Sequence, residues 1–364
     1  MPISNRPAAI CRGRAPLVES DTAAVRAGEE LKRVALVDYL NTHLPGGAPD
    51  VEIEQFPNGH SNLVYLIRTD HREYVLRRPP LGPVAPKAHD MAREYRVLKA
   101  VNPHFPEAPR VFLLCEDPSV IGSAFFLMER RRGIVIRDSI PRELAAIPDY
   151  PRLVSEAFID CLVRLHAIDV SQPGLSSLGK PQGFVERQVR GWSERWDRAK
   201  TEDIPELNGI VRWLNDYLPP SIEATLVHND YKVDNVMLRP QGDGVEAVLD
   251  WEMTTIGDPL ADLGLTMCYW SWASMTAVTS QEGWYTRDQF LERYAQLTGR
   301  DLTHIRYHEV LGIFKLAVIL QQIYYRFHRG QTQDERFRTF DQRVRGLIRL
   351  AASLTLGEHE KERV

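Results

Sequence analysis

One stretch in the second half of the chain combines polar residue types at a spacing that suits phosphoryl transfer. His228, Asp230 and Asn235 form the pattern H-x-D-x-x-x-x-N between apolar residues. A carboxylate on a loop, here Asp230, can accept the proton of an attacking hydroxyl. The apolar stretch 247–249 then ends in a second carboxylate, Asp250. Asn235 and Asp250 offer the oxygen ligands that can hold magnesium against nucleotide phosphates.

The pattern alone is a weak signal, because short motifs of this kind also arise by chance. Asp230 could instead cap a turn, and Asn235 could begin one. We favour the chemical role for both, because a hairpin-like stretch and a second carboxylate follow at a suitable distance. A structural hydrogen-bonding role is favoured for His228. Asp258 and Asp262 flank an expected turn or helix start, which favours loop architecture over metal binding.

The first part of the chain predicts a small sheet with flanking helices. Period-two alternation and short polar turns predict an antiparallel meander. Its strands are expected at 51–56, 63–68 and 74–77, two further strands at 111–115 and 124–129, and helices at 23–44 and 88–100.

Beyond Gly133 helical periodicity prevails, interrupted by one short β-like patch at 224–249. Helices are expected at 150–167, 184–200, 206–218, 287–299, 307–327 and 340–354. The sequence thus predicts an α+β fold with a small N-terminal lobe, which holds a five-stranded antiparallel sheet, and a larger, mostly helical C-terminal lobe. The expected boundaries are a tail at 1–22 and lobes at 23–130 and 131–364, with a cleft between the lobes.

Composition excludes several classes of protein. The net charge of −4 over 364 residues argues against a general nucleic-acid binder. The four cysteines show no C-x-x-C spacing, which fits neither a disulfide framework nor a structural zinc site and suits a reducing compartment. No apolar run approaches the length of a membrane span. We therefore expect a soluble cytoplasmic protein that binds neither nucleic acid nor membrane; the sequence leaves its oligomeric state open, with a homodimer among the alternatives.

On these motifs the chain resembles the aminoglycoside and choline kinase-like phosphotransferases, small-molecule relatives of the protein kinases. The branch it resembles is the one related to the kinase domains of acyl-CoA dehydrogenase ten/eleven type proteins. The resemblance covers about 51–330; its sharpest segments are 228–238, 249–252 and 257–263, and its weaker ones are 59–62 and 74–80. It implies a bilobal protein-kinase-like fold with ATP and Mg²⁺ as cofactors. By this resemblance Asp230 is the catalytic base, and Asn235 and Asp250 are the magnesium ligands.

The resemblance also places nucleotide contacts in the first lobe. It implies a turn over the ATP phosphates formed by Gly59, His60, Ser61 and Asn62, and a connector beside adenine formed by Met128, Glu129 and Arg130. From the residues alone, the 59–62 segment is equally well explained as an ordinary hairpin turn.

The main departure from the protein-kinase pattern is the cation expected to grip the phosphates. Protein kinases carry a lysine on the third strand, paired with a glutamate on the next helix; here Arg77 and Glu94 hold these places. The planar fork of arginine can clamp a phosphate and a carboxylate together. The alternative is that Arg77 blocks the nucleotide and that the protein is a non-catalytic nucleotide-binding regulatory module. A protein kinase is disfavoured, because no A-P-E segment follows Asp250.

The expected acceptor is a small molecule with a hydroxyl group, bound against the helical lobe. The candidate contacts are Trp270, Trp272, Gln321, Tyr324, Tyr325 and Arg326. An aromatic stripe at helical spacing is more often part of a core, and that alternative is favoured for these residues. The aromatic and basic character of these segments favours an apolar or anionic acceptor, such as a hydroxyacyl-CoA or a hydroxy acid, over an aminoglycoside or choline.

Overall fold

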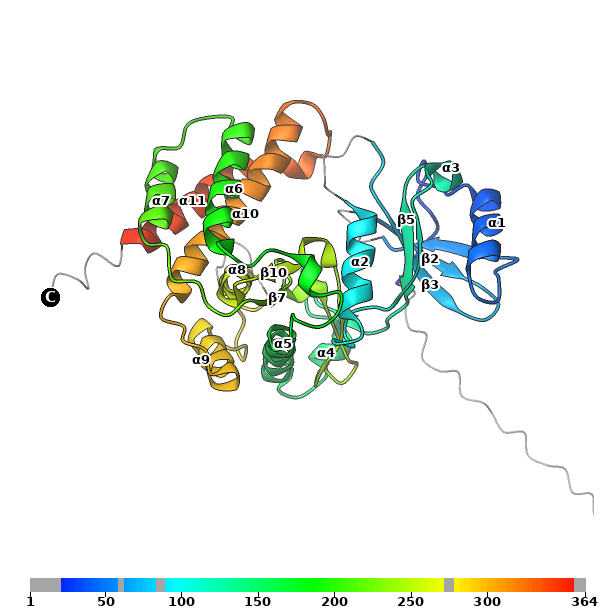
Figure 1. Cartoon of the computed structure of the whole chain (residues 1–364), viewed down its shortest axis with the longest axis horizontal. Helices are drawn as coiled ribbons and strands as arrows, with labels where there is room; N and C mark the ends of the chain where they lie inside the picture. The colour runs from blue at the N-terminus through cyan, green and yellow to red at the C-terminus, as the bar shows by residue number, and fades with distance from the viewer. Residues whose placement is uncertain (1–20, 58–61, 83–88, 272–277, 357–364) are drawn as a thin grey trace, which may run out of the picture.

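A five-stranded antiparallel sheet forms the N-terminal part of the molecule, at the right of Figure 1. The computed structural model describes residues 21–57, 62–82, 89–271 and 278–356. The strands are β1 (Glu52–Gln55), β2 (Leu63–Arg68), β3 (Glu73–Arg78), β4 (Val111–Cys115) and β5 (Phe125–Glu129), in the order β1-β2-β3-β5-β4. This confirms the expected meander and both further strands. The register sets Arg77 opposite Val64 and Val75 opposite Met128, which places these four residues in the middle of the sheet.

Helices cover both faces of this sheet. Helices α1 (Arg33–His43) and α3 (Pro118–Ile121) lie on one face, and α2 (Met91–Val101) lies on the other, toward the helical part (Figure 1). Successive side chains of a strand point to opposite faces, so Phe125 packs in the cluster with α1 and α3, whereas Phe126 packs in the cluster with α2. Asp90 caps α2 by accepting from the Arg93 N–H at 2.9 Å.

The expected helix at 23–44 is wrong over its first ten residues. Ala23 forms a β-bridge with Gln55, with N···O distances of 2.9 and 2.8 Å. Gly28 has a φ of +84°, a backbone conformation that ends any helix and that glycine adopts at little cost. The Gln55 side chain also donates to Glu29 at 2.5 Å. Tertiary pairing with the sheet edge therefore holds this segment extended.

The C-terminal part is helical, as expected. Its helices are α4 (Arg142–Ala145), α5 (Tyr150–His166), α6 (Phe184–Ala199), α7 (Pro205–Asp216), α8 (Pro259–Ser271), α9 (Arg287–Thr298), α10 (Ile305–His328) and α11 (Phe340–Leu356). The α8 helix is missing from the sequence prediction, because it is apolar on nearly all sides and shows no clear amphipathic period. It crosses α10 closely: a Cβ added at Gly264 would lie 2.4 Å from the carbonyl carbon of His308.

Short strands between these helices carry the predicted chemistry. Strands β6 (Ile134–Val135), β8 (Val236–Leu238) and β9 (Val245–Val248) form one small sheet, and β7 (Thr225–Val227) pairs with β10 (Thr255–Gly257). Val236 pairs with Val248, and the Leu249 N–H donates to the Asn235 carbonyl at 2.8 Å. Asn235 and Asp250 therefore stand at the same end of one hairpin.

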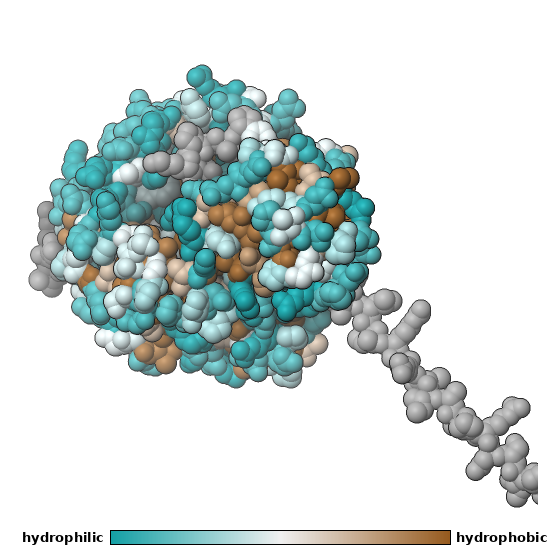
Figure 2. All heavy atoms as spheres, turned by 45° about the vertical axis from the view of Figure 1, so that its right-hand side comes forward, coloured by the Kyte–Doolittle hydropathy of each residue, from teal (hydrophilic) through white to brown (hydrophobic). Residues whose placement is uncertain are grey.

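Within the described ranges, one helix, α10, is long and apolar enough to cross a membrane, although the sequence contains no uninterrupted apolar run of that length. Of its most apolar 18-residue window, 61% is buried inside the protein, a pattern that core helices of soluble proteins also show. The face of the molecule drawn in Figure 2 is mostly hydrophilic, with apolar residues gathered in a few patches.

Candidate active site

A cavity of about 600 Å³ lies between the five-stranded sheet and the small sheet of the helical part. Its walls are apolar at Val64, Val75, Met128, Met237 and Leu249, and charged or polar at Arg77, Lys232, Asp234, Asn235 and Asp250. Cavities of this size that combine an apolar lining with a few convergent polar groups are typical small-molecule sites.

Arg77 joins the two sides of this cavity. Its Nη2 donates to Asp250 Oδ1 at 2.5 Å, and its Nε lies 2.9 Å from Glu94 Oε2 on α2. Burial disfavours the charged form of Asp250, but the Arg77 guanidinium outweighs burial and holds the pKa of Asp250 below its ordinary value. Asp250 is therefore a carboxylate at neutral pH. Its φ of +65° is uncommon for a residue with a side chain, and such conformations cluster at functional sites.

Three side chains orient Asp230: two donate hydrogen bonds to it, and one is a nearby cation. The Asn235 Nδ2 donates to Asp230 Oδ2 at 2.8 Å and to the Asp230 carbonyl at 2.9 Å. The Tyr269 hydroxyl donates to the other carboxylate oxygen at 2.9 Å, and Lys232 Nζ lies 3.3 Å from Oδ2. Because the amide nitrogen of Asn235 is committed to Asp230, the amide oxygen remains as its ligand atom. Asp230 itself does not line the 600 Å³ cavity; Asn235 stands between the two.

Tyr269 and Lys232 are site residues that the sequence reasoning missed. Burial and the nearby Asp230 raise the pKa of Tyr269 well above its ordinary value, so its hydroxyl stays protonated and can donate. Burial opposes the charge of Lys232, but Asp230 and Asp234 outweigh burial and raise its pKa. Tyr269 follows Asp262 by seven residues, which places both on one face of α8, but this helix is apolar on nearly all sides and shows no polar face that would have singled Tyr269 out.

The loop before Asp230 is fixed by the buried carboxylate of Asp262. This carboxylate accepts the backbone N–H groups of His228 at 2.6 Å and Asn229 at 2.8 Å, and it lies 3.2 Å from His166 Nε2. Asn229 has a φ of +65°, which asparagine tolerates better than most residues. Asp262 therefore holds loop architecture, in line with the sequence interpretation.

His228 also has a structural contact. Its Nε2 lies 3.0 Å from the Leu249 carbonyl, and since a carbonyl only accepts, Nε2 carries the proton. His228 thus ties the loop that carries Asp230 to the residue before Asp250, as its expected structural role requires.

The expected phosphate turn can be placed only in part, because Gly59, His60 and Ser61 lie outside the described residues. Asn62 is buried, and its amide lies 2.9 Å from His89 Nδ1. With its oxygen turned toward Arg77, this amide also accepts from Arg77 Nη2 at 2.8 Å.

The expected connector residues Met128, Glu129 and Arg130 all line the cavity. The Arg130 guanidinium is already engaged: Nη2 lies 2.7 Å from Asp21 Oδ1, and the group stacks over the Phe56 ring at 4.8 Å. Its side chain therefore closes the cavity edge rather than pointing freely into the cavity.

Two of the expected acceptor contacts are wrong. Trp270 is 3% exposed and packs against Trp284 and Phe290 in the core. Gln321 is also buried, and its amide donates to the Ala199 carbonyl at 2.9 Å. Both point inward because α8 and α10 are central helices with no free face at these positions.

The remaining acceptor candidates differ in exposure. Tyr324 and Tyr325 are half-buried; Tyr324 stacks with His328 at the end of α10, and Tyr325 lies under Arg329 just beyond it. Arg326 is exposed. Trp272 lies outside the described residues.

Among the described residues, no group of three or more His, Cys, Asp or Glu side chains is arranged to hold a metal ion. Asn235 and Asp250 form a smaller donor set of one amide oxygen and one carboxylate. Such sparse sets suit Mg²⁺, which keeps several waters and takes further ligands from substrate phosphates.

Comparison with known proteins identifies relatives along most of the chain. Acyl-CoA dehydrogenase family member 11 of Gallus gallus is 32% identical over 355 residues, which cover 93% of this chain and 45% of that protein. Acyl-CoA dehydrogenase family member 10 of Mus musculus is 34% identical over 325 residues, which cover 85% of this chain and 30% of that protein. The chain thus spans less than half the length of these relatives.

Solved structures share the fold. A candidate aminoglycoside phosphotransferase from Ralstonia eutropha superposes with a TM-score of 0.77 at 28% identity, covering 90% of this chain and 98% of that one. A ternary complex of aminoglycoside phosphotransferase APH(4)-Ia with AMP-PNP and hygromycin B superposes with a TM-score of 0.60 at 17% identity, covering 89% and 99%. These neighbours confirm the α+β, protein-kinase-like fold. A family model described as "Phosphotransferase enzyme family" matches residues 52–307, and the chain therefore belongs to that family.

Proposed function

We propose that this protein transfers the γ-phosphoryl group of ATP to a hydroxyl of a small molecule, with Asp230 as the catalytic base. The observation that carries this proposal is the arrangement around the β8–β9 hairpin. Asn235 holds the Asp230 carboxylate at 2.8 Å and shares one hairpin end with Asp250, at the wall of the cavity. This set supplies a proton acceptor and two oxygen ligands at one place.

The cavity is suited to a nucleotide. Its volume of about 600 Å³ and its apolar walls at Val75, Met128 and Leu249 favour an adenine ring between the two parts of the molecule. Arg77 and Lys232 supply the positive charge that phosphates need. The AMP-PNP complex of the fold neighbour supports this placement.

The donor chemistry at Asn235 and Asp250 fits magnesium. The low pKa of Asp250 keeps it charged, and the Asn235 amide presents its oxygen because its nitrogen is committed to Asp230. Magnesium, when bound, neutralises charge on the phosphates.

The chain's own residues perform the rest. Asp230, oriented by Tyr269 and Asn235, accepts the proton of the attacking hydroxyl, and Arg77 and Lys232 hold the transferring group in line by electrostatic attraction.

For the acceptor we favour a hydroxyacyl-CoA or hydroxy acid over an aminoglycoside or choline. The names of the relatives support acyl-CoA chemistry, because each is called an acyl-CoA dehydrogenase family member. The test is to measure ATP consumption in the presence of hydroxyacyl-CoAs, hydroxy acids, choline and aminoglycosides. Turnover with a hydroxyacyl-CoA or a hydroxy acid would support the preference. Turnover with aminoglycosides alone contradicts the preference.

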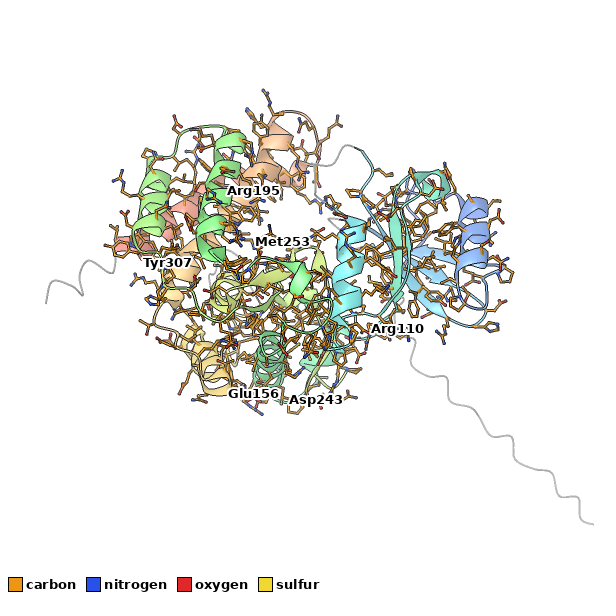
Figure 3. The ribbon with its side chains drawn as sticks, viewed as in Figure 1. Arg110, Glu156, Arg195, Asp243, Met253 and Tyr307 are labelled. Carbon is orange, nitrogen blue, oxygen red and sulfur yellow. The ribbon has the colours of Figure 1, made fainter. Side chains whose placement is uncertain are left out.

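The decisive experiment compares the wild type with Asp230→Asn. We expect the variant to keep Mg²⁺-dependent ATP affinity within several-fold and to lose about 10²-fold or more in turnover, since a positioned base is removed. Asp243→Asn is the matched control: this exposed aspartate lies between β8 and β9, at the hairpin end remote from Asn235 (Figure 3). Equal turnover in wild type and Asp230→Asn removes Asp230 from the mechanism, and ATP binding without transfer in the wild type supports a regulatory module instead.

A further inference from the structure

A buried lysine stands directly behind the loop that carries Asp230. Lys315 on α10 is 6% exposed, and its Nζ donates to the backbone carbonyl of Asn229 at 2.9 Å. An ammonium group has three N–H donors, and this carbonyl is its one hydrogen-bond acceptor among the described residues. Buried charges are normally paired, because removing a charge from water is costly. Lys315 therefore lacks the partner that its burial calls for.

A second cation stands at the same aromatic ring. The Lys315 Nζ lies 5.7 Å from the ring centroid of Trp192 on α6, and the guanidinium carbon of Arg195 lies 4.4 Å from that centroid. The neighbouring acid on α6, Glu194, faces Arg198 at 4.0 Å, and within the described part of the chain no carboxylate lies within ion-pair distance of either cation.

The two cations repel each other. Burial, with a smaller contribution from the nearby Arg195, lowers the pKa of Lys315 to about 8, although Asp230 and Asp262 favour the charged form through space. Lys315 is thus mostly charged at neutral pH. Two like charges around one indole, close to Asp230, form a site that an anion would stabilise.

We infer that Lys315, Arg195 and Trp192 form a subsite for an anionic group of the acceptor, a carboxylate or a phosphate, beside the proton-accepting Asp230. This inference deepens the proposed function and rests on it for the identity of the ligand as acceptor. A second cavity touches Lys315, Trp192 and Asn229, but its volume of about 10 Å³ holds at most one water. Because this void cannot hold a carboxylate or a phosphate, the anion would contact the exposed Arg195 directly, and the charge of Lys315 would attract it through space.

The test is equilibrium binding to the full chain, saturated with AMP-PNP and Mg²⁺ so that anions do not enter the nucleotide site. The probes are 3-hydroxybutyrate for a carboxylate, glycerol 3-phosphate for a phosphate, and the neutral 3-hydroxybutyramide, titrated with ligand-observed NMR. We expect at least one anionic probe to bind more tightly than the amide. Its Kd rises about tenfold or more in Lys315→Met and in Arg195→Gln, and the amide is unaffected.

The control is Arg212→Gln, which removes an exposed positive charge on α7 and should change nothing. If Lys315→Met does not fold, Arg195→Gln still tests the inference, because Arg195 is exposed and its replacement should not disturb the fold. Equal binding of anions and amide in the wild type overturns the inference, as does an anion Kd that neither Lys315→Met nor Arg195→Gln changes. If Lys315 only supports the Asn229 carbonyl, Lys315→Met weakens acid and amide alike, and Arg195→Gln has no effect.

This measurement separates the inference from the proposed function. Charge-dependent binding without phosphate transfer by the wild type overturns the proposed function and leaves the anionic subsite standing. Phosphate transfer without any preference for anionic probes overturns the subsite alone.

Discussion

The Arg77 guanidinium bridges Glu94 on α2 and Asp250 after β9, with its Nη2 2.5 Å from Asp250 Oδ1. One nearly buried cation thereby joins the sheet, its covering helix and the hairpin that carries Asn235. The same contact sets the position of Asp250 at the cavity wall. On the proposed function, stability and nucleotide binding both depend on this side chain, and mutation can separate the two.

Replacing Arg77 with Met should destabilise the fold by about 3–5 kcal/mol, because it leaves the Glu94 carboxylate buried without its partner. Removing both charges in Arg77→Met/Glu94→Leu should recover the part of this loss that comes from Glu94, but neither the part that comes from Asp250 nor ATP affinity. Urea unfolding and nucleotide titration measure the two effects. Arg68→Met on β2 is the control: Arg68 is partly exposed, so losing its ion pairs should cost less than about 1 kcal/mol. If Arg77→Met is as stable as the wild type, the ion pair with Glu94 does not stabilise the fold as argued.

Tyr269→Phe removes one donor from Asp230 while Asn235 and Lys232 remain. A hydrogen bond to a charged group contributes about 1.5–3 kcal/mol, so we expect kcat to fall roughly tenfold or more, with the KM for ATP unchanged. The loss should stay smaller than that of Asp230→Asn. Steady-state kinetics is the measurement, and Tyr217→Phe, at an exposed tyrosine after α7, is the control. An unchanged kcat in Tyr269→Phe shows that the hydroxyl does not position Asp230.

Gly264→Ala should destabilise the helical part strongly. The added Cβ would lie 2.4 Å from the carbonyl carbon of His308 and 2.5 Å from its oxygen, so α8 and α10 would have to separate. We expect a loss of about 3 kcal/mol, at the upper end of overpacking costs. Gly346→Ala in α11 meets nothing within 4 Å and should gain about 0.5–1 kcal/mol from helix propensity. Thermal unfolding of both variants tests the pair, and equal Tm values would refute the close crossing.

His308 should make stability depend on pH. Burial lowers the pKa of His308 to about 3, and its two ring nitrogens have no hydrogen-bond partner within the described residues. The unfolded chain, with a pKa near 6.5, binds more protons between about pH 3 and 6.5. The stabilisation is thus fully present above pH 6.5 and is lost as pH falls through this window.

The comparison protein for this test is His308→Leu, which cannot titrate at that position. Relative to it, the wild type should lose about 1.4 kcal/mol per pH unit below pH 6.5, or about 2 kcal/mol at pH 5. Urea unfolding at pH 7.5, 6.5 and 5 measures the difference. Parallel pH profiles of the two proteins would mean that His308 is protonated in the fold.

The sequence predicted the chemical hairpin because all of its determinants are local. The pairing of a three-residue strand with a four-residue strand fixes which residues stand at the open end of the hairpin. The spacing of Asn235 and Asp250 therefore already implies that they stand at the same end. The five strands of the sheet were predictable for a similar reason, since strand-forming residues and the polar turns between them are properties of consecutive residues.

The helical side of the site was not predictable in this way. Tyr269 and Lys315 lie on α8 and α10, which are buried on nearly all sides and so show no polar face that would indicate orientation. For the same reason Trp270 and Gln321, expected at the acceptor, turn out to be core residues.

The sequence by itself therefore determined the residue types, the hairpin and the alternating strands, all of which follow from short-range geometry. Tertiary structure alone decided that Asp262 holds the loop, that Tyr269 reaches Asp230 and that Lys315 donates to the Asn229 carbonyl. These contacts join segments 33 to 86 residues apart. They depend on how closely two central helices cross, which is set by packing against the whole core.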